Sequence, residues 1–222
     1  MSTQGAAGWC ATDPQGSPVL NWRYSYRFDQ SAPLSGEGLE ANPMKVFVGT
    51  EFSDFGDAQL ISCGLAAENG DELYFELKDG WCLADCSPFV RESVLPWLER
   101  SSATALTRAE AAPAMLTWLR SLGCRVTLMY DATIDWILVR GLLDDQVWDG
   151  ISIDAKALSW PANAMARHFR DLLVQSLTKT GRHHSLDDAR ALRTAALQTE
   201  TEFRESLTRR QGHVADREGL DR

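Results

Sequence analysis

Residues 44–77 read MKVFVGTEFSDFGDAQLISCGLAAENGDELYFEL, and this stretch decides the fold. Short apolar runs at 45–48 and 59–67 predict two strands, and residues 72–77 predict a third. The intervening residues 68–71, Glu-Asn-Gly-Asp, have the composition of a tight turn. Three strands joined by such short connections indicate an antiparallel meander.

Helical patterns follow the meander. Residues 88–99 carry apolar side chains at helical spacing. Thr107 and Glu110 form a capping box that opens a second helix. Pro113 falls inside that helix, so we expect either a kink there or a helix that begins near Ala112.

The second half of the chain is predicted to alternate strands and helices: a strand at 125–130, a helix at 136–143, a strand at 151–153, an amphipathic helix at 163–178 and a last helix from Ser185 to about Arg209. The apolar stripe of the amphipathic helix is typical of core packing. The chain therefore predicts an α/β domain at 44–210, with a mixed five-stranded sheet flanked by helices.

The two ends of the chain differ from this domain in composition. Residues 1–43 are rich in Gly, Ser, Pro and Ala, which is typical of an extension. Within it, aromatic residues alternate with Arg and Ser at 22–28, which predicts an edge strand; an aromatic and basic surface for nucleic acid is the alternative. Residues 211–222 are polar and predict a flexible tail.

Composition and charge exclude several classes of protein. The 222 residues are 44% hydrophobic, so the chain is not disordered throughout, and no apolar run approaches the roughly 20 residues of a membrane span. The net charge of −9 argues against a protein that coats nucleic acid, but it allows binding at a small site. The first eight residues lack a secretory signal pattern, so we expect a cytoplasmic protein.

The five cysteines include no CxxC pair. Cys82 and Cys86 are four residues apart, with neither a second pair nor a His nearby, so a zinc site is a poor interpretation. Buried reduced thiols explain these residues better.

Three short blocks place acidic and histidine side chains at the ends of predicted elements. Glu51 follows the first strand, Asp135 follows the fourth, and His183 and Asp188 flank the start of the last helix. Carboxylates so placed can converge on one point, and hard oxygen ligands are what Mg²⁺ requires. A neutral His nearby could accept a proton from a water molecule.

In this order the blocks resemble those of the DnaQ-like (DEDDh) 3′–5′ exonucleases, and in particular a family of small bacterial 3′–5′ exoribonucleases. Residues 49–51 align with the family's D-x-E, residues 130–136 (YDATIDW) with its second block, and residues 183–189 (HHSLDDA) with its H-x-A-x-x-D-A. The resemblance extends from Met44 to about Leu197. It implies the ribonuclease H-like fold.

The resemblance also implies roles for single residues. Glu51, Asp135 and Asp188 would bind Mg²⁺ or Mn²⁺ in a two-metal site, and His183 would be the general base. The implied substrate is a single-stranded 3′ end, RNA more than DNA, with no membrane partner; homodimerisation is a further family expectation. Five residues are candidates for contacting the substrate: Thr50, Phe52, Tyr130, Trp136 and His184.

One position departs from the family pattern. Gly49 stands where the first Asp of D-x-E bridges both metals, and glycine supplies no ligand. We therefore expect metal affinity and rate to fall steeply, unless Asp54 reaches the site in its place. The chain is either an impaired exonuclease or a catalytically inactive exonuclease-fold protein that binds nucleic acid or has a regulatory role.

Taken singly, these residues also have structural interpretations. Glu51 could be a solvated carboxylate, Asp135 could cap the helix that follows it, and Asp188 could stabilise the first turn of the last helix. His183 and His184 could be exposed loop residues. A third interpretation of the whole chain is an assembly subunit that binds a protein through its aromatic N-terminal segment.

Overall fold

The structure is a computed structural model, and it describes residues 43–99, 104–143, 153–158, 164–180 and 183–219. Its strands are β1 (Met44–Phe52), β2 (Leu60–Ala67), β3 (Glu72–Leu77), β4 (Ala105–Leu106), β5 (Val126–Tyr130) and β6 (Ile153–Ala157). Its helices are α1 (Pro88–Ser93), α2 (Arg108–Ser121), α3 (Thr133–Leu143), α4 (Ala164–Thr180) and α5 (Ser185–Gly219), with short 3₁₀ turns at Leu83–Asp85 and Leu95–Trp97.

The strands form one mixed sheet in the order β4-β3-β2-β1-β5-β6. The meander predicted from residues 44–77 is confirmed, because β1 pairs antiparallel with β2 and β2 antiparallel with β3. On its other side β1 pairs in parallel with β5, and β5 pairs in parallel with β6. Strand β1 therefore lies inside the sheet, with a neighbour along both edges.

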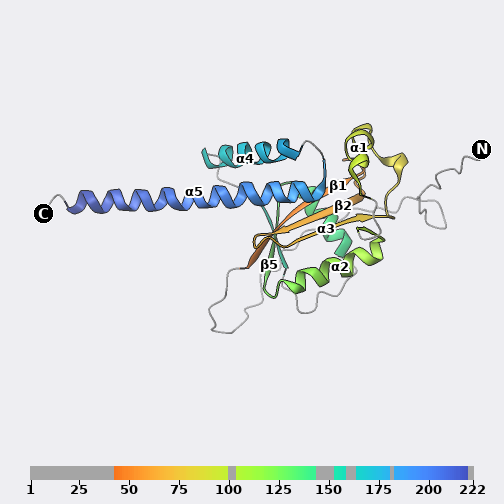
Figure 1. Ribbon diagram of the computed structural model, residues 1–222, viewed down its shortest axis with the longest axis horizontal. Coiled ribbons are helices and arrows are strands. Elements are labelled where there is room, and N and C mark those ends of the chain that lie inside the picture. The colour runs from red at the N-terminus through yellow and green to blue at the C-terminus, as the bar shows by residue number, and fades with distance from the viewer. Residues whose placement is uncertain (1–42, 100–103, 144–152, 159–163, 181–182, 220–222) are drawn as a thin grey trace, which may run out of the picture.

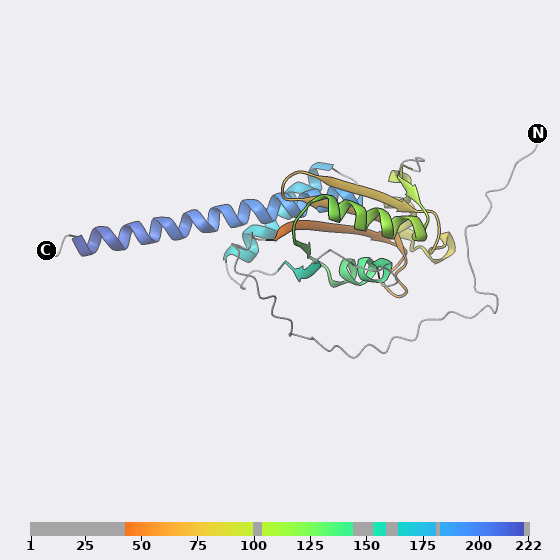
Figure 2. The same cartoon turned by 90° about the horizontal axis from the view of Figure 1, so that it is seen from below.

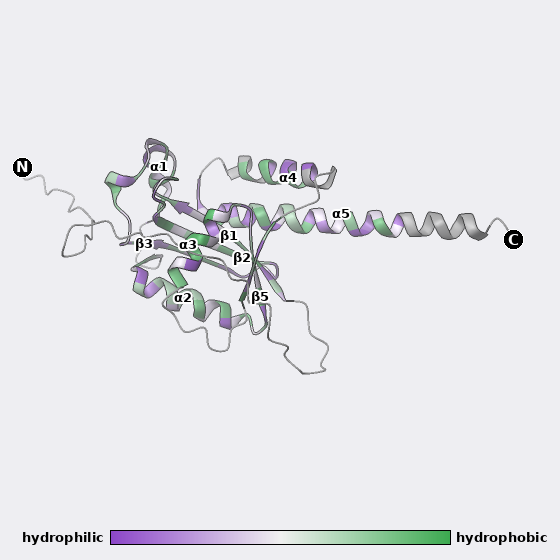
Figure 3. Ribbon diagram, turned by 180° about the vertical axis from the view of Figure 1, so that it is seen from behind, coloured by the Kyte–Doolittle hydropathy of each residue, from purple (hydrophilic) through white to green (hydrophobic). Residues whose placement is uncertain are grey.

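Helices cover both faces of this sheet (Figure 1), and the alternation of side chains along β1 shows how. Val46 and Val48 pack into a core shared with α2 and α3. Phe47, between them in sequence, packs into a second core with Phe169 of α4 and Leu192 of α5. Odd-numbered residues of β1 therefore face α5. Figure 2 shows α5 running on beyond the sheet, and Figure 3 shows that hydrophobic and hydrophilic residues alternate along α4 and α5.

The α/β class and the flanking helices are confirmed, but the number of strands is not. The sheet has six strands rather than the predicted five, because the two residues of β4 pair in parallel with β3. So short a strand has no periodicity of its own and depends on its neighbour. The last predicted strand, at 151–153, is found at Ile153–Ala157.

Two proline residues explain most of the differences in the helices. The helix predicted at 88–99 ends at Ser93 and is followed by a 3₁₀ turn, because Pro96 lacks an N–H and disfavours helical backbone in the residue before it. Pro113 does not delay α2, which begins at Arg108 behind the predicted capping box of Thr107 and Glu110.

The boundaries of other elements shift in ways that matter for the site. Helix α3 begins at Thr133, so Asp135 lies in its first turn and does not cap it. Helix α5 continues to Gly219, well past the predicted end near Arg209. The predicted extension at 1–43, with its strand at 22–28, falls almost entirely outside the described residues.

Two further expectations concern the membrane and the cysteines. Among the described residues, no helix is both long enough and apolar enough to cross a membrane. Cys63 and Cys86 are free and buried, as the sequence predicts, whereas Cys124 is free but exposed.

Candidate functional site

The candidate site lies where the end of β1 meets the first turn of α5. Glu51 shares the α5-facing side of β1 with Gly49 and Phe47, by the alternation described above. Its side chain is 9% exposed, and no hydrogen-bond donor reaches its Oε1. Asp188, in the first turn of α5, is within hydrogen-bonding reach of Glu51. Two of the predicted ligands are therefore brought together.

Asp135 approaches from the opposite face of the sheet. Helix α3 holds it 6% exposed, and the hydroxyl of Thr50 donates a 2.6 Å hydrogen bond to its Oδ1. Thr50 has even parity on β1, which turns it toward α3 rather than toward α5. Thr50, predicted to contact the substrate, instead orients one of the carboxylates.

Burial and mutual repulsion raise the pKa values of these carboxyl groups. The pKa of Glu51 is raised by burial first, and then by the charge and hydrogen bond of Asp188. The pKa of Asp188 is raised by burial and by the charges of Asp131, Asp135 and Asp187. Burial raises the pKa of Asp135 to about 6, although the hydrogen bond from Thr50 opposes the shift. Neither Glu51 nor Asp188 forms an ion pair with a described Lys or Arg.

A cavity of about 100 Å³ adjoins the carboxylates. It is lined by Gly49, Thr50, Asp131, Asp135, Leu173, Leu177, Asp188 and Leu192. A liquid water molecule occupies about 30 Å³, so this volume suits a few water molecules or a hydrated ion. Its leucine side chains come from α4 and α5, so these two helices close the acidic cavity on the side away from the sheet.

Gly49 lies directly against the main chain of α5. A Cβ atom built on Gly49 would lie 2.3 Å from the carbonyl oxygen of Ser185 and 3.0 Å from the nitrogen of Ala189. Gly64 is its partner across the β1–β2 pair, and a Cβ there would lie 2.3 Å from Cα of Leu186. We call these two paired glycines the glycine seat of α5.

A buried hydrogen bond fixes the helix on this seat. Oγ of Ser62 on β2 and Oγ of Ser185 on α5 are 3.0 Å apart, with both residues buried. Asp54 does not take the place of the missing carboxylate, because its Oδ1 accepts a hydrogen bond from the backbone N–H of Gly56 in the following turn. Asp54 is also not among the residues that line the cavity.

The two histidines predicted at the site differ in position. His183 is exposed just before α5, and its ring contacts Phe89 edge-on at 4.8 Å. His184 is 5% exposed and stacks on Tyr74 with ring centroids 4.4 Å apart. His183 is thus accessible to a ligand, whereas His184 contributes to the interior in this conformation.

The predicted aromatic contacts lie nearby but are partly built into the core. Tyr130 and Trp136 are nearly parallel, with centroids 6.4 Å apart, and Trp136 packs against the core as the sequence analysis allows. Phe52 also packs there and contacts Phe55 edge-on at 5.0 Å. Phe55 is 84% exposed, so the loop after β1 presents an aromatic ring to solvent.

Sequence reasoning missed two residues of this site. Asp131 lines the cavity, and its position directly after a strand was a usable signal. Gly64 completes the glycine seat, and an isolated glycine within an apolar strand often marks a close backbone approach.

The donor set fits one divalent cation better than two. Among the described residues, no three His, Cys, Asp or Glu side chains are gathered so as to hold a metal ion. A buried carboxylate with an unpartnered oxygen, paired with a second carboxylate, nevertheless suits Mg²⁺, which proteins often bind through one or two carboxylates plus substrate phosphates. The position that would bridge two ions carries Gly49 and has no side-chain ligand to offer.

Comparisons with known proteins do not add a family. No protein-family model matches the chain, and no curated protein is similar enough to match it.

Proposed function

We propose that this protein is a metal-dependent 3′–5′ exonuclease that hydrolyses the terminal phosphodiester of single-stranded nucleic acid, RNA in preference to DNA. The observation that carries the proposal is the buried pair of Glu51 and Asp188. These residues come from distant parts of the chain, lie within hydrogen-bonding reach and have no basic partner among the described residues.

Such a pair is unstable as two neighbouring anions, and this argues for a cation as its natural partner. Burial of like charges raises their pKa values, as it does here for Glu51 and Asp188. Protein carboxylates that are retained in this state are frequently functional. When bound, Mg²⁺ or Mn²⁺ would activate a water molecule and stabilise the charge that develops on the phosphate.

The other residues of the site can be given roles on this basis. Glu51 and Asp188 would hold the cation, and Asp135, fixed by Thr50, would add negative charge beside the cavity. The exposed His183 would accept the proton of the attacking water. Water would add to phosphorus as the bond to the 3′ oxygen breaks, which releases a mononucleotide.

The charge of the protein favours recognition of an end rather than of a long backbone. With a net charge of −9, extended contacts to phosphates are disfavoured. The exposed rings of Phe55 and Phe89 offer stacking surfaces near the end of β1 and near His183. A cytoplasmic location and a homodimer stay predictions.

A second candidate function is binding without catalysis. Gly49 favours it, because the bridging carboxylate of the resembling family is absent. In that case the chain would bind a 3′ end and leave it intact.

A digestion assay separates these functions. 5′-labelled single-stranded RNA and DNA are incubated with the chain in Mn²⁺ or Mg²⁺, next to Asp188→Asn and the exposed control Asp57→Asn. The proposal expects a ladder of products shortened from the 3′ end, abolished in Asp188→Asn and kept in Asp57→Asn. Retention of the oligonucleotide without any shortening would favour the binding protein, and a ladder that persists in Asp188→Asn would contradict the proposed site.

A further inference from the structure

The place of the missing carboxylate is filled by main chain. The nearest neighbour of a Cβ on Gly49 would be the Ser185 carbonyl oxygen at 2.3 Å, a separation that real Cβ atoms do not show. Cβ of Asp188 would be 3.1 Å away. Gly49 therefore does not leave an empty ligand position, because the first turn of α5 occupies the space that a side chain would need.

The second glycine shows that this close approach extends across two strands. Gly64 pairs with Gly49 in register, and its Cβ would meet both N and Cα of Leu186 at 2.3 Å. The hydrogen bond between Ser62 and Ser185 holds the same turn from the side. Helix α5 is seated on the sheet by several contacts, so the region beside position 49 is closed.

The carboxylates that stay available number two. Asp135 is held by Thr50 on the other face of the sheet. Glu51 retains an oxygen without a donor although its side chain is only 9% exposed, and its neighbour is Asp188. This agrees with the lack of any three-ligand group among the described residues.

We propose that this site binds a single divalent cation between Glu51 and Asp188, and that a phosphate group of the bound nucleic acid completes its coordination. The inference rests on the proposed function and specifies how many ions it uses. Mg²⁺ and Mn²⁺ need about six oxygen ligands, so two carboxylates leave positions for water and for phosphate oxygens. Metal and nucleic acid should therefore strengthen each other's binding.

Titration calorimetry with Mn²⁺ tests this on the full chain. Mn²⁺ is added to the protein alone and to the protein with a single-stranded oligonucleotide whose 3′-terminal linkages are phosphorothioates, which resist hydrolysis. We expect one Mn²⁺ per chain, bound at least about fivefold more tightly with the oligonucleotide present. Glu51→Gln and Asp188→Asn should each lose this binding, and Asp57→Asn should keep it. Circular dichroism checks that each variant is folded.

Each other outcome overturns the inference in its own way. Two Mn²⁺ ions per chain would contradict the single-ion site and leave the proposed exonuclease intact. One ion that survives both Glu51→Gln and Asp188→Asn would place the metal elsewhere. An affinity unchanged by the oligonucleotide would remove the phosphate from the coordination. No Mn²⁺ in either state would overturn the inference, and the digestion assay would then decide separately whether the chain is an exonuclease.

Discussion

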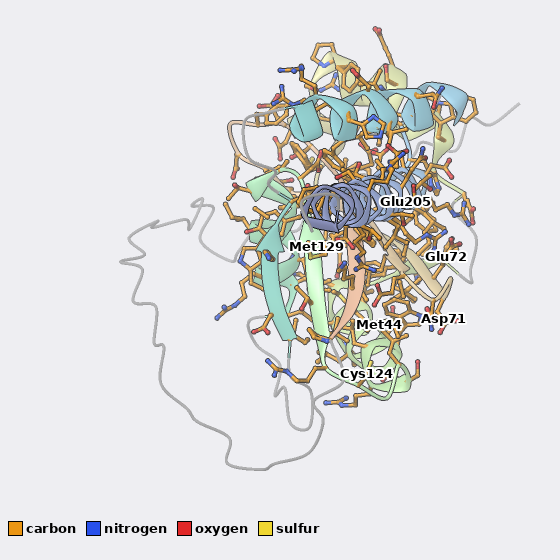
Figure 4. The ribbon with its side chains drawn as sticks, turned by 90° about the vertical axis from the view of Figure 1, so that its left-hand side faces the viewer. Met44, Asp71, Glu72, Cys124, Met129 and Glu205 are labelled. Atoms are coloured by element: carbon orange, nitrogen blue, oxygen red, sulfur yellow. The ribbon has the colours of Figure 1, made fainter. Side chains whose placement is uncertain are left out.

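Two carboxylate clusters lie along the first turns of α5, and they are treated in opposite ways. In one, Glu72 of β3 accepts hydrogen bonds from Arg190 and Arg193, and Arg190 also pairs with Asp187 at 3.0 Å. In the other, Glu51 and Asp188 face each other without a basic partner among the described residues. Figure 4 looks along α5 and shows Glu72 and Met129 on either side of the helix.

The electrostatic difference between the two clusters is one of sign. Hydrogen bonds from Arg190 lower the pKa of Glu72, whereas burial and Asp188 raise the pKa of Glu51. Asp187 and Asp188 are adjacent in sequence, yet only Asp187 has an arginine partner. The paired cluster fastens α5 to β3. The unpaired cluster opposes folding, and such groups are typically kept for binding or catalysis.

The largest effect should come from filling the glycine seat. Gly49→Asp places a side chain where the Ser185 carbonyl lies, so we expect a loss of about 3 kcal/mol or more in the free energy of unfolding, and no gain of nuclease activity. Urea denaturation measures the loss. The control is Gly141→Ala in α3, where the nearest neighbour of the new Cβ would be 3.7 Å away and helix propensity favours alanine. A Gly49→Asp chain that folds normally and cuts faster would contradict the seat.

The pH dependence of stability should separate the two clusters next. A raised carboxyl pKa means that the folded chain holds protons that the unfolded chain has released. Stability without divalent ions should therefore fall by about 2 kcal/mol as the pH rises from about 5 to about 8. The lowered pKa of Glu72 acts in the other window, and its contribution is lost as the pH falls below about 4.5.

Urea denaturation in EDTA across this range gives the curve. Saturating Mn²⁺ should flatten the decline between pH 5 and 8, because a bound cation favours the ionised carboxylates. Stability that rises over that window in EDTA would contradict the unpaired cluster.

Removal of the paired carboxylate should destabilise the chain moderately. Glu72→Gln weakens the bonds to Arg190 and Arg193, and because Glu72 and both arginines are partly exposed we expect a loss of only about 1–2 kcal/mol. Glu205→Gln, at an exposed pair with Arg209, should change stability by less than about 0.5 kcal/mol. Equal effects of the two substitutions in urea denaturation would show that the Glu72 cluster does not fasten α5.

The matching substitution in the unpaired cluster should have the opposite sign. Glu51→Gln removes one of two facing carboxylates and keeps the shape of the side chain, so we expect a gain of about 1 kcal/mol at pH 8 in EDTA. Nuclease activity should be lost at the same time. A destabilised Glu51→Gln chain would mean that Glu51 has a structural partner.

Much of the site could be predicted from the sequence because its acidic residues follow strands or open a helix. Glu51 and Asp188 were placed correctly by such local signals, and the meander from Met44 to Leu77 supplied the frame. The identity of position 49 as a glycine was visible, but its reason was not. The approach of α5 depends on packing between segments far apart in the chain, and only the isolated Gly64 hinted at it.

Other features depended on tertiary context in the same way. Strand β4 consists of two residues that become a strand only beside β3. The interior position of His184 comes from its stacking on Tyr74, a residue from another element. The Thr50–Asp135 hydrogen bond joins β1 to α3, and neither residue alone indicates it.

The central claim is that Glu51 and Asp188 form a cation site, and thermal unfolding in rising Mn²⁺ tests it most directly. A ligand that binds only the folded chain must raise its midpoint of unfolding. We predict that Mn²⁺ raises the midpoint of the unaltered chain in a saturable way and leaves that of Glu51→Gln unchanged. A midpoint that does not respond to Mn²⁺ in the unaltered chain, or that rises equally in Glu51→Gln, would contradict the claim.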